Sequence, residues 1–279
     1  MKALIFAAGL GTRLKPITDT MPKALVPICG KPLLAHVAEK LKSAGFGSIV
    51  INVHHFAEQI REYVAANRQF GIDVSFSDET DMLRETGGGI RHAAPLLDDG
   101  EPFLVHNVDI LSNLDIEKFV WVHKKYAADA LARSLSVLAT LLVSDRKTQR
   151  YLLFNSDNNL AGWMIIKTGE VRSPYKALRR EAGEGAVFQL GEGGFDYEAF
   201  LKKYNLKKYA FDGAHVISPE IFALMKEWPE KFSIIDFYLE MCGRYDIKYY
   251  LQPGLEMIDV GKFDSLQAAE EMAEKLKKC

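Results

Sequence analysis

The chain has 279 residues, 48% of them hydrophobic, and a formal net charge of −2 at pH 7. This length can bury a large core, and the near-neutral charge excludes the basic footprint of a nucleic-acid-binding protein. Its 3 cysteines form no Cys-x-x-Cys pair, and no apolar run approaches the ~18 residues that span a membrane. Because Met1 and Lys2 lead directly into a strand without room for a signal peptide, we expect a cytoplasmic protein with no nucleic-acid or membrane partner.

The first part of the chain alternates apolar strands with amphipathic helices. In the first predicted helix, which begins at Lys31 and Pro32 and ends at Gly45, apolar side chains recur on one face. This alternation predicts a mostly parallel mixed sheet with helices on both faces, a three-layer α/β/α Rossmann-like fold. Strands are expected over residues 2–7, 48–53, 72–77 and 102–107, and further helices over residues 57–66 and 86–93.

From residue 135 the pattern changes to consecutive short strands, which indicates an antiparallel or mixed addition to the parallel sheet. The glycine-rich segment 183–194 is typical of an irregular loop. The remaining expected elements are strands over residues 135–144, 151–154, 160–166, 209–217, 249–251 and 257–258, and helices over residues 219–227, 233–242 and 263–277.

The most informative motif is the segment 4–14, Leu-Ile-Phe-Ala-Ala-Gly-Leu-Gly-Thr-Arg-Leu, followed by Pro-Lys-Ala-Leu at 22–25. A buried strand runs here into a glycine-rich loop, whose successive N–H groups can cradle anionic oxygens. Arg13 and Lys23 would add two fixed positive charges beside those oxygens. The motif therefore suits the phosphates of a nucleoside triphosphate.

Two other phosphate-binding loops are excluded by the spacing. No Gly-x-x-x-x-Gly-Lys-Ser/Thr run occurs, so this is not a Walker A loop. A dinucleotide fingerprint needs a third glycine where Leu14 stands, and the acidic residue expected about 20 positions later is missing.

Residues 2–34 resemble the N-terminal signature of the sugar-1-phosphate nucleotidylyltransferases. Three later segments follow in that family's order: Glu-Thr-Gly-Gly-Gly-Ile at 85–90, His-Asn-Val-Asp-Ile at 106–110 and Ile-Asp-Val-Gly at 258–261. The similarity extends to about Asn113 and resumes at about Tyr209, whereas the middle of the chain matches poorly. The 85–90 segment most resembles the N-acetylmuramate-1-phosphate uridylyltransferase branch, with the mannose-1-phosphate guanylyltransferases close by.

This resemblance implies a GT-A-like, nucleotide-diphospho-sugar transferase fold in a single domain. Its expected parts are a nucleotide-binding half (1–113), a sugar-binding half (114–262) and a C-terminal helix (263–279). The implied reaction joins a nucleoside monophosphate from an NTP to a sugar-1-phosphate and releases pyrophosphate. Mg²⁺ is the implied cofactor.

The resemblance also implies site residues. Arg13 and Lys23 would be catalytic, and Asp109 and Asp259 would hold the metal, although Val108 stands where the family often has glycine. The nucleotide contacts would be Ala7, Ala8, Gly9, Gly11, Thr12, Thr86, Gly87 and Asn107. Because the family's Glu-Lys-Pro motif is absent, the expected sugar contacts are Asp212 and Gly213 together with Arg146, Arg150 and Lys167.

The substrates stay open at this point. UTP is the favoured donor, and the alternatives are guanylyl transfer to mannose- or heptose-1-phosphate and cytidylyl transfer to phosphocholine. A non-catalytic regulator that binds nucleotide sugars is the alternative from another class, but it would not need a pair of metal-binding carboxylates. A monomer and a homodimer are both compatible with the sequence.

Overall fold

The computed structural model describes residues 1–180, 189–190 and 194–277. Contacts within the chain divide it into two compact units. The first unit comprises residues 1–121, 213–233 and 253–279, and the second comprises residues 122–212 and 234–252. The first unit thus gathers residues from all three segments expected from the sequence, and the single-domain organisation stays a prediction.

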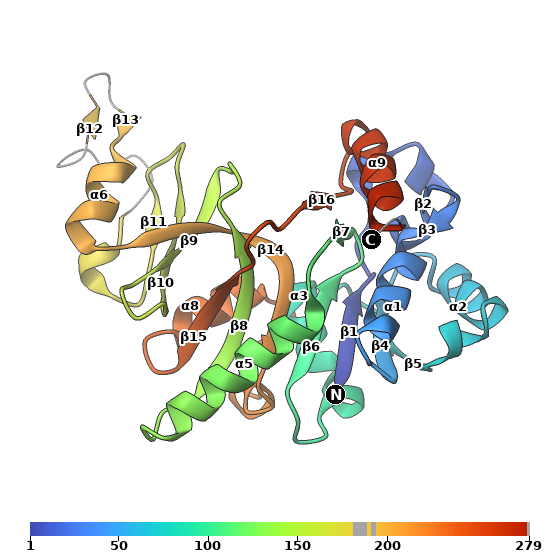
Figure 1. Ribbon diagram of the computed structural model, residues 1–279, viewed down its shortest axis with the longest axis horizontal. Coiled ribbons are helices and arrows are strands. Elements are labelled where there is room, and N and C mark those ends of the chain that lie inside the picture. Colours follow the sequence, from blue (N-terminus) through green and yellow to red (C-terminus); the bar gives the residue numbers. More distant parts are fainter. Residues whose placement is uncertain (181–188, 191–193, 278–279) are drawn as a thin grey trace. The chain divides into compact units, whose positions relative to one another are not determined.

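The first unit is built on a mixed, mostly parallel sheet. Its parallel strands are β6 (Phe103–Asn107), β1 (Lys2–Phe6), β4 (Ser48–Val53) and β5 (Asp73–Asp78), in this spatial order (Figure 1). The last four residues of β14 (Lys207–Ile217) add an antiparallel strand beside β6. All five strands fall where the sequence predicts them, with ends that shift by one or two residues.

Helices follow the parallel strands in the predicted alternation. They are α1 (Leu33–Ser43), α2 (Ala57–Ala66), α3 (Glu85–His92) and α4 (Ala94–Leu97). In α1, the predicted apolar face is buried and consists of Leu33, Leu34, Val37, Ala38 and Leu41. The α/β/α architecture with flanking helices around a mostly parallel mixed sheet is therefore confirmed.

Short elements surround the carboxyl edge of this sheet. β7 (Ile110–Ser112) pairs antiparallel with β16 (Met257–Asp259), and the C-terminal helix α9 (Leu266–Lys277) packs on both strands. The remaining short elements of the unit are β2 (Pro27–Ile28), β3 (Lys31–Pro32), α7 (Ile221–Leu224) and the 3-10 turns η1 (Thr12–Leu14), η2 (Ile17–Asp19), η3 (Lys23–Leu25), η4 (Arg68–Gly71) and η6 (Phe263–Ser265).

The second unit contains further paired strands. β8 (Val137–Ser144) pairs in parallel with β15 (Asp246–Leu251), and β10 (Leu160–Ile165) lies antiparallel between β9 (Arg150–Phe154) and β11 (Val171–Arg172). The first residues of β14 pair with β9. The other elements here are α6 (Tyr197–Tyr204), α8 (Ile234–Met241), η5 (Lys176–Leu178) and the strand pair β12 (Gln189–Leu190) and β13 (Gly194–Phe195).

Several elements differ from the sequence prediction. The helix α5 (Ile116–Leu131) and the helix α6 were not predicted, and the helix expected over 219–227 shortens to α7. β8 does not form a hairpin with the strand that follows it, because its parallel partner β15 comes about a hundred residues later in the chain. Most of the loop expected over 183–194 lies outside the described residues.

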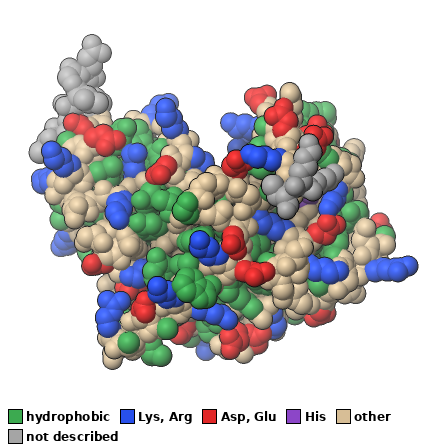
Figure 2. Space-filling model, viewed as in Figure 1, with side chains coloured by type: hydrophobic (Ala, Val, Ile, Leu, Met, Phe, Trp, Pro, Cys, Tyr) green, Lys and Arg blue, Asp and Glu red, His purple; other side chains and the backbone are tan. Residues whose placement is uncertain are grey.

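No helix in the described part of the chain is long and apolar enough to cross a membrane. The space-filling view shows Lys and Arg interspersed with Asp and Glu over the face that it presents (Figure 2). Charges of the two signs are therefore mixed on this face rather than gathered into a patch of one sign.

The three consecutive glycines of α3 let another segment approach its backbone. An ideal Cβ at Gly88 would lie only 2.2 Å from the carbonyl oxygen of Glu230, and one at Gly87 would lie 2.3 Å from the ring of Phe232. The carbonyl oxygen of Phe232 accepts hydrogen bonds from the N–H groups of both glycines, at 2.9 and 3.2 Å. Two of the three glycines therefore make room for residues 230–232.

Replacing Gly88 with alanine is expected to lower the free energy of unfolding by about 1–3 kcal/mol, despite the higher helix propensity of alanine. The new methyl group would overlap the Glu230 carbonyl, so the two backbones would have to separate. Gly47→Ala is the matched control, because a Cβ at Gly47 meets nothing within 4 Å. Urea unfolding followed by circular dichroism compares the two, and equal stabilities would show that this close contact is not maintained.

Candidate active site

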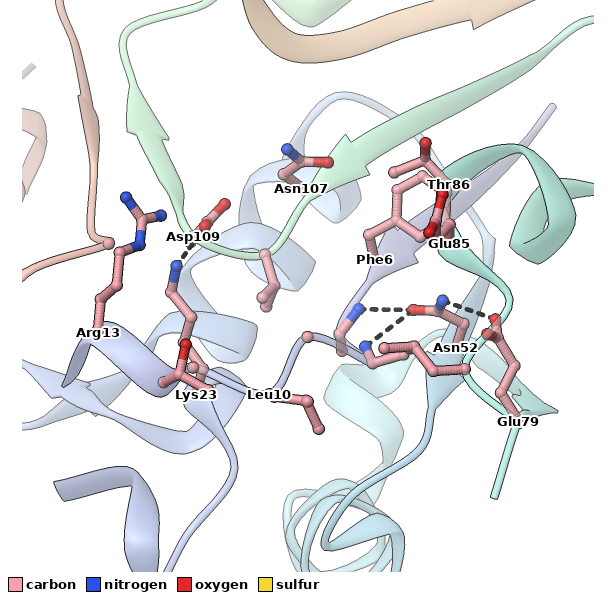
Figure 3. Close-up of a pocket in the computed structure, with 18 residues that line it drawn as sticks. Phe6, Leu10, Arg13, Lys23, Asn52, Glu79, Glu85, Thr86, Asn107 and Asp109 are labelled. Carbon is pink, nitrogen blue, oxygen red and sulfur yellow. Dashed lines mark hydrogen bonds and ion pairs between the residues drawn. The ribbon is translucent and has the colours of Figure 1, made fainter. Parts of the chain in front are cut away.

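A cavity of about 450 Å³ lies beyond the carboxyl ends of β1 and β6, within the first unit. This is the edge of an open α/β sheet where ligands bind. Figure 3 shows Arg13, Lys23 and Asp109 at one end of the cavity and Glu85, Thr86 and Glu79 at the other. The lining residues are Phe6, Ala7, Ala8, Gly9, Leu10, Gly11, Thr12, Arg13, Lys23, Asn52, Glu79, Leu83, Glu85, Thr86, Asn107, Val108, Asp109 and Gly261.

The glycine-rich loop takes its shape from Gly11. This residue has φ +63°, in the left-handed region that favours glycine, and an added Cβ would lie 2.8 Å from the Cγ2 of Thr18. The carbonyl oxygen of Gly11 accepts hydrogen bonds from the Thr18 hydroxyl, at 2.9 Å, and from the N–H of Leu14, at 2.8 Å. The loop is thereby fastened at its far end, where η1 carries Arg13.

Lys23 and Asp109 form an ion pair at the charged end of the cavity. The ammonium Nζ of Lys23 donates a hydrogen bond to Oδ2 of Asp109, although the two residues are far apart in sequence (Figure 3). Lys23 is buried in the η3 turn, and Asp109 lies two residues after the end of β6. The structure therefore brings together two of the predicted site residues, and each charge is the partner of the other.

Asp259 lies beside this pair on the neighbouring strand. It is directly opposite Ile110 in the β7–β16 pair, and the N–H of Val260 donates to the carbonyl oxygen of Asp109 at 2.8 Å. An ideal Cβ at Gly261 would lie 2.7 Å from Oδ1 of Asp259 and 3.0 Å from Nη2 of Arg13. Only a residue without a side chain leaves the Asp259 carboxylate and the Arg13 guanidinium undisturbed at this wall of the cavity.

The donor set at this point fits a hard divalent cation. Carboxylate oxygens are the ligands that Mg²⁺ prefers, and it commonly binds through one or two carboxylates with phosphates and waters. Asp109 and Asp259 are carboxylates on adjacent chain segments, and no cluster of three or more His, Cys, Asp or Glu with metal-binding geometry occurs among the described residues. The residues thus suit a substrate-assisted Mg²⁺ site rather than an all-protein cage.

The backbone N–H groups of Ala7 and Ala8 are already occupied. Both donate to Oδ1 of Asn52, at 2.6 and 3.1 Å, so a ligand can meet only the carbonyls of these two residues (Figure 3). Among the described residues, the N–H groups of Gly9 and Leu10 have no protein partner. The backbone N–H groups of the loop that a ligand could use therefore begin at Gly9.

The other end of the cavity is formed by the start of α3. Glu85 has φ +60°, a conformation that side chains disfavour and that is concentrated at functional sites. Glu85 and Thr86 line the cavity, whereas Gly87 does not, because it packs against Phe232. The expected contact of Gly87 with the nucleotide stays a prediction.

Asn107 is positioned by a glycine. Gly213 has φ +71°, and a Cβ there would lie 2.7 Å from the Nδ2 of Asn107.

The neighbouring His106 is buried, and burial lowers its pKa to about 4, so its imidazole is neutral at pH 7. Among the described lining residues, Arg13 and Lys23 therefore supply the positive charge.

The other expected sugar contacts belong to the second unit. Nε of Arg146 donates to Oδ1 of Asp212 at 2.8 Å, and Nη2 of Arg146 donates to the carbonyl of Phe211 at 2.9 Å. Burial raises the pKa of Asp212, and the Arg146 guanidinium opposes this rise. Arg150 lies at the start of β9 and Lys167 follows β10, both exposed. A role of these residues in sugar binding stays a prediction.

Three residues that line the cavity were not predicted from the sequence. Asn52 lies in an apolar strand, Ile-Val-Ile-Asn-Val, where a buried polar side chain is the signal that could have revealed it. Glu79 follows β5 directly, at the same sheet edge as the glycine loop. Leu83 belongs to no motif, and only the folded chain places it in the cavity wall.

Residues 2–158 match the family model described as nucleotidyl transferase. The match covers more than half of the chain, so the chain belongs to the nucleotidyl transferase family. Its matched relatives include sugar-1-phosphate uridylyl- and guanylyltransferases, which confirms the resemblance to the sugar-1-phosphate nucleotidylyltransferases.

Two relatives and one solved structure illustrate the extent of this similarity. The chain is 45% identical over 115 residues to an N-acetylmuramate alpha-1-phosphate uridylyltransferase of Neisseria meningitidis serogroup B, which covers 41% of this chain and 49% of the relative. It is 29% identical over 272 residues to a UTP--glucose-1-phosphate uridylyltransferase of Synechocystis sp., covering 92% and 67%. A UDP-glucose pyrophosphorylase solved with UDP-glucose superposes with a TM-score of 0.68 at 19% identity, covering 99% and 98%, which shows the fold alone.

The chain spans about half the length of the N-acetylmuramate uridylyltransferases that it matches. The matched half holds the glycine loop, Lys23 and Asp109, whereas Asp259 lies outside the family-model match.

Proposed function

We propose that this protein is a sugar-1-phosphate nucleotidylyltransferase, which transfers a nucleoside monophosphate from an NTP to a sugar-1-phosphate and releases pyrophosphate. The observation that carries the proposal is the Lys23–Asp109 ion pair at the end of a glycine-rich loop, with Arg13 beside it in one cavity. A cation and a carboxylate next to free backbone N–H groups suit phosphate groups and a divalent cation at the same place.

This chemistry needs no catalytic triad. A phosphate monoester has a second pKa near 6, so the attacking oxygen of a sugar-1-phosphate is largely ionised at neutral pH. The barrier comes from bringing two anions together in line and from stabilising the charge in the transition state. In this proposal, Lys23 contacts the α-phosphate and the incoming phosphate, and Arg13 contacts the departing phosphates.

Asp109 and Asp259 would hold Mg²⁺. The cation, when bound, neutralises the phosphate charge and orients the phosphate oxygens. The cavity itself argues for this requirement, because its lining carries the carboxylates of Glu79, Glu85 and Asp109 against the two cations of Arg13 and Lys23. An NTP would add further negative charge to a site that has no positive excess.

The polarity of the cavity orients the nucleotide. The triphosphate belongs at the Arg13–Lys23 end, so the base belongs at the end formed by Glu85 and Thr86. UTP remains the favoured donor, supported by the 85–90 segment and by the 45% identity to an N-acetylmuramate uridylyltransferase. Guanylyl transfer is the second candidate, because mannose-1-phosphate guanylyltransferases match at 38% identity over 131 residues.

A purely regulatory role finds less support, since all four charged residues of the proposed chemistry are present. Cytidylyl transfer to phosphocholine stays a further alternative. The proposal also includes the sugar contacts expected from the sequence and a cytoplasmic location. It further includes a contribution to cell-wall or surface polysaccharide synthesis and a monomeric or homodimeric state.

The proposal is tested by following pyrophosphate release with Mg²⁺ across UTP, GTP, CTP, ATP and dTTP, each with a panel of sugar-1-phosphates and phosphocholine. We expect turnover with a sugar-1-phosphate and the highest rate with UTP. Preference for another base would correct the donor alone, whereas no release with any pair would refute the enzymatic function.

Arg13→Ala and Lys23→Ala should each lower kcat by about 10²–10³-fold, by analogy with the loss of one preorganised donor to a developing anion. Lys15→Ala is the matched control, because Lys15 forms an exposed ion pair with Asp19 and does not line the cavity. Steady-state kinetics measure all three variants, and circular dichroism verifies their fold. Near-normal rates for Arg13→Ala or Lys23→Ala would remove that residue from the mechanism.

Asp259→Asn should abolish the rise in melting temperature that Mg²⁺ and NTP together produce. A ligand that binds only the folded state stabilises it by mass action, and this variant removes one anionic ligand. Asp264→Asn, an exposed acid in η6, is the control that should retain the full rise. Equal shifts in both variants, measured by differential scanning fluorimetry, would show that Asp259 does not hold the cation.

A further inference from the structure

A buried chain of hydrogen bonds connects the glycine loop with the start of α3. Oδ1 of Asn52 accepts from the N–H groups of Ala7 and Ala8, and Nδ2 of Asn52 donates to Oε1 of Glu79 at 2.9 Å. The second carboxylate oxygen, Oε2 of Glu79, accepts from the N–H of Arg84 at 3.0 Å. Arg84 is the residue directly before α3. Figure 3 shows the Asn52 side chain between the loop and Glu79.

The donors and acceptors in this chain of hydrogen bonds allow only one orientation of the Asn52 amide. Two N–H donors face one side of the Asn52 amide, so its oxygen must lie there, and its NH₂ group must face the carboxylate. Glu79 accepts with both of its oxygens, which matches an ionised carboxylate. Asn52 is 2% exposed and Glu79 is 0% exposed, so water cannot replace a missing partner.

Glu79 itself is held from several sides. Its N–H donates to the carbonyl of Val53 at 2.8 Å, and its own carbonyl oxygen contacts Nδ1 of His54 at 2.6 Å. Above it, Gly89 of α3 leaves little space, since a Cβ there would lie 3.0 Å from Oε1 of Glu79 and 3.4 Å from Nδ2 of Asn52. The carboxylate is therefore a fixed point between β4, β5 and α3.

We propose that Asn52 and Glu79 are positioning residues, which set the glycine loop and the first turn of α3 at the separation that a nucleotide requires. This inference rests on the proposed function. The loop and the first turn of α3 form opposite walls of the cavity, and this relay joins them through side chains alone. Because Asn52 occupies the N–H groups of Ala7 and Ala8, it also orients the peptide that leads to the free N–H of Gly9.

The relay predicts a rescue that ordinary packing would not give. Asn52→Asp places a second carboxylate against Glu79, and Glu79→Gln places an NH₂ group against one of two N–H donors. Each single variant has nearly the native shape but one mismatched contact. In the double variant Asn52→Asp/Glu79→Gln, Asp accepts from the loop and from the Gln amide, and the Gln oxygen accepts from Arg84. Every donor again meets an acceptor.

The experiment measures KM for the best NTP, kcat and KM for the sugar-1-phosphate in the wild type, both single variants and the double variant. We expect each single variant to raise the NTP KM at least about tenfold with a smaller effect on kcat, since a buried donor or acceptor loses its partner. The double variant should return the NTP KM to within about threefold of the wild-type value. The KM for the sugar-1-phosphate should not follow this pattern.

Asn159→Asp is the matched control. Nδ2 of Asn159 donates to Oδ1 of Asp246 at 2.8 Å, so this variant also turns a second carboxylate toward an acid, here one whose other oxygen is paired with Lys248 at 3.0 Å, in the second unit. Its melting temperature should fall, whereas its NTP KM should stay at the wild-type value. A rise in KM equal to that of Asn52→Asp would mean that general destabilisation explains the effect, and the relay would be overturned.

Single variants with wild-type KM for the NTP, or a double variant no better than the worse single one, would also overturn the inference. If a single variant does not fold, the double variant must still fold and bind nucleotide. Melting temperatures of the four proteins give the coupling between the two sites without any substrate. A wild-type protein that binds and converts no triphosphate would instead refute the proposed function, whatever coupling is found.

Discussion

The parallel pairing of β1 between β6 and β4 is the constraint on which the site depends. Phe6, at the end of β1, is in register with Asn107 of β6 on one side and with Asn52 of β4 on the other. The three strands therefore end level at one edge, and the segments that follow them leave from the same place. Residues separated by about a hundred positions in the chain become neighbours there without any long loop.

Charge in this site is arranged in pairs rather than as a positive patch. Lys23 is paired with Asp109, and both oxygens of the Glu79 carboxylate accept hydrogen bonds, so these buried groups have partners within the protein. Arg13 stands at the wall formed by Gly261, beside the Asp259 carboxylate. In the proposed function, phosphate oxygens and a cation would take the place of these internal partners, so no buried charge would be left unpaired.

The local sequence determined a large part of this protein. The apolar strands and the amphipathic face of α1 are readable because burial imposes a period of two or 3.6 on the residues themselves. The glycine loop with Arg13 and Lys23 is readable because close backbone approach and phosphate charge demand particular residue types at short spacing. The family follows from these segments, since they lie in the matched region.

Only the tertiary structure determined which residues that are far apart in sequence contact each other. The sequence around Gly88 does not predict its contact with Glu230, and the sequence around β8 does not predict its parallel pairing with β15. Asn52 looks like one polar residue in an apolar strand until the fold places it between the loop and Glu79. Periodicity and motif spacing reflect only the interactions between residues that are close in sequence. Contacts between distant segments depend on how the whole chain closes its core, so only the folded chain shows them.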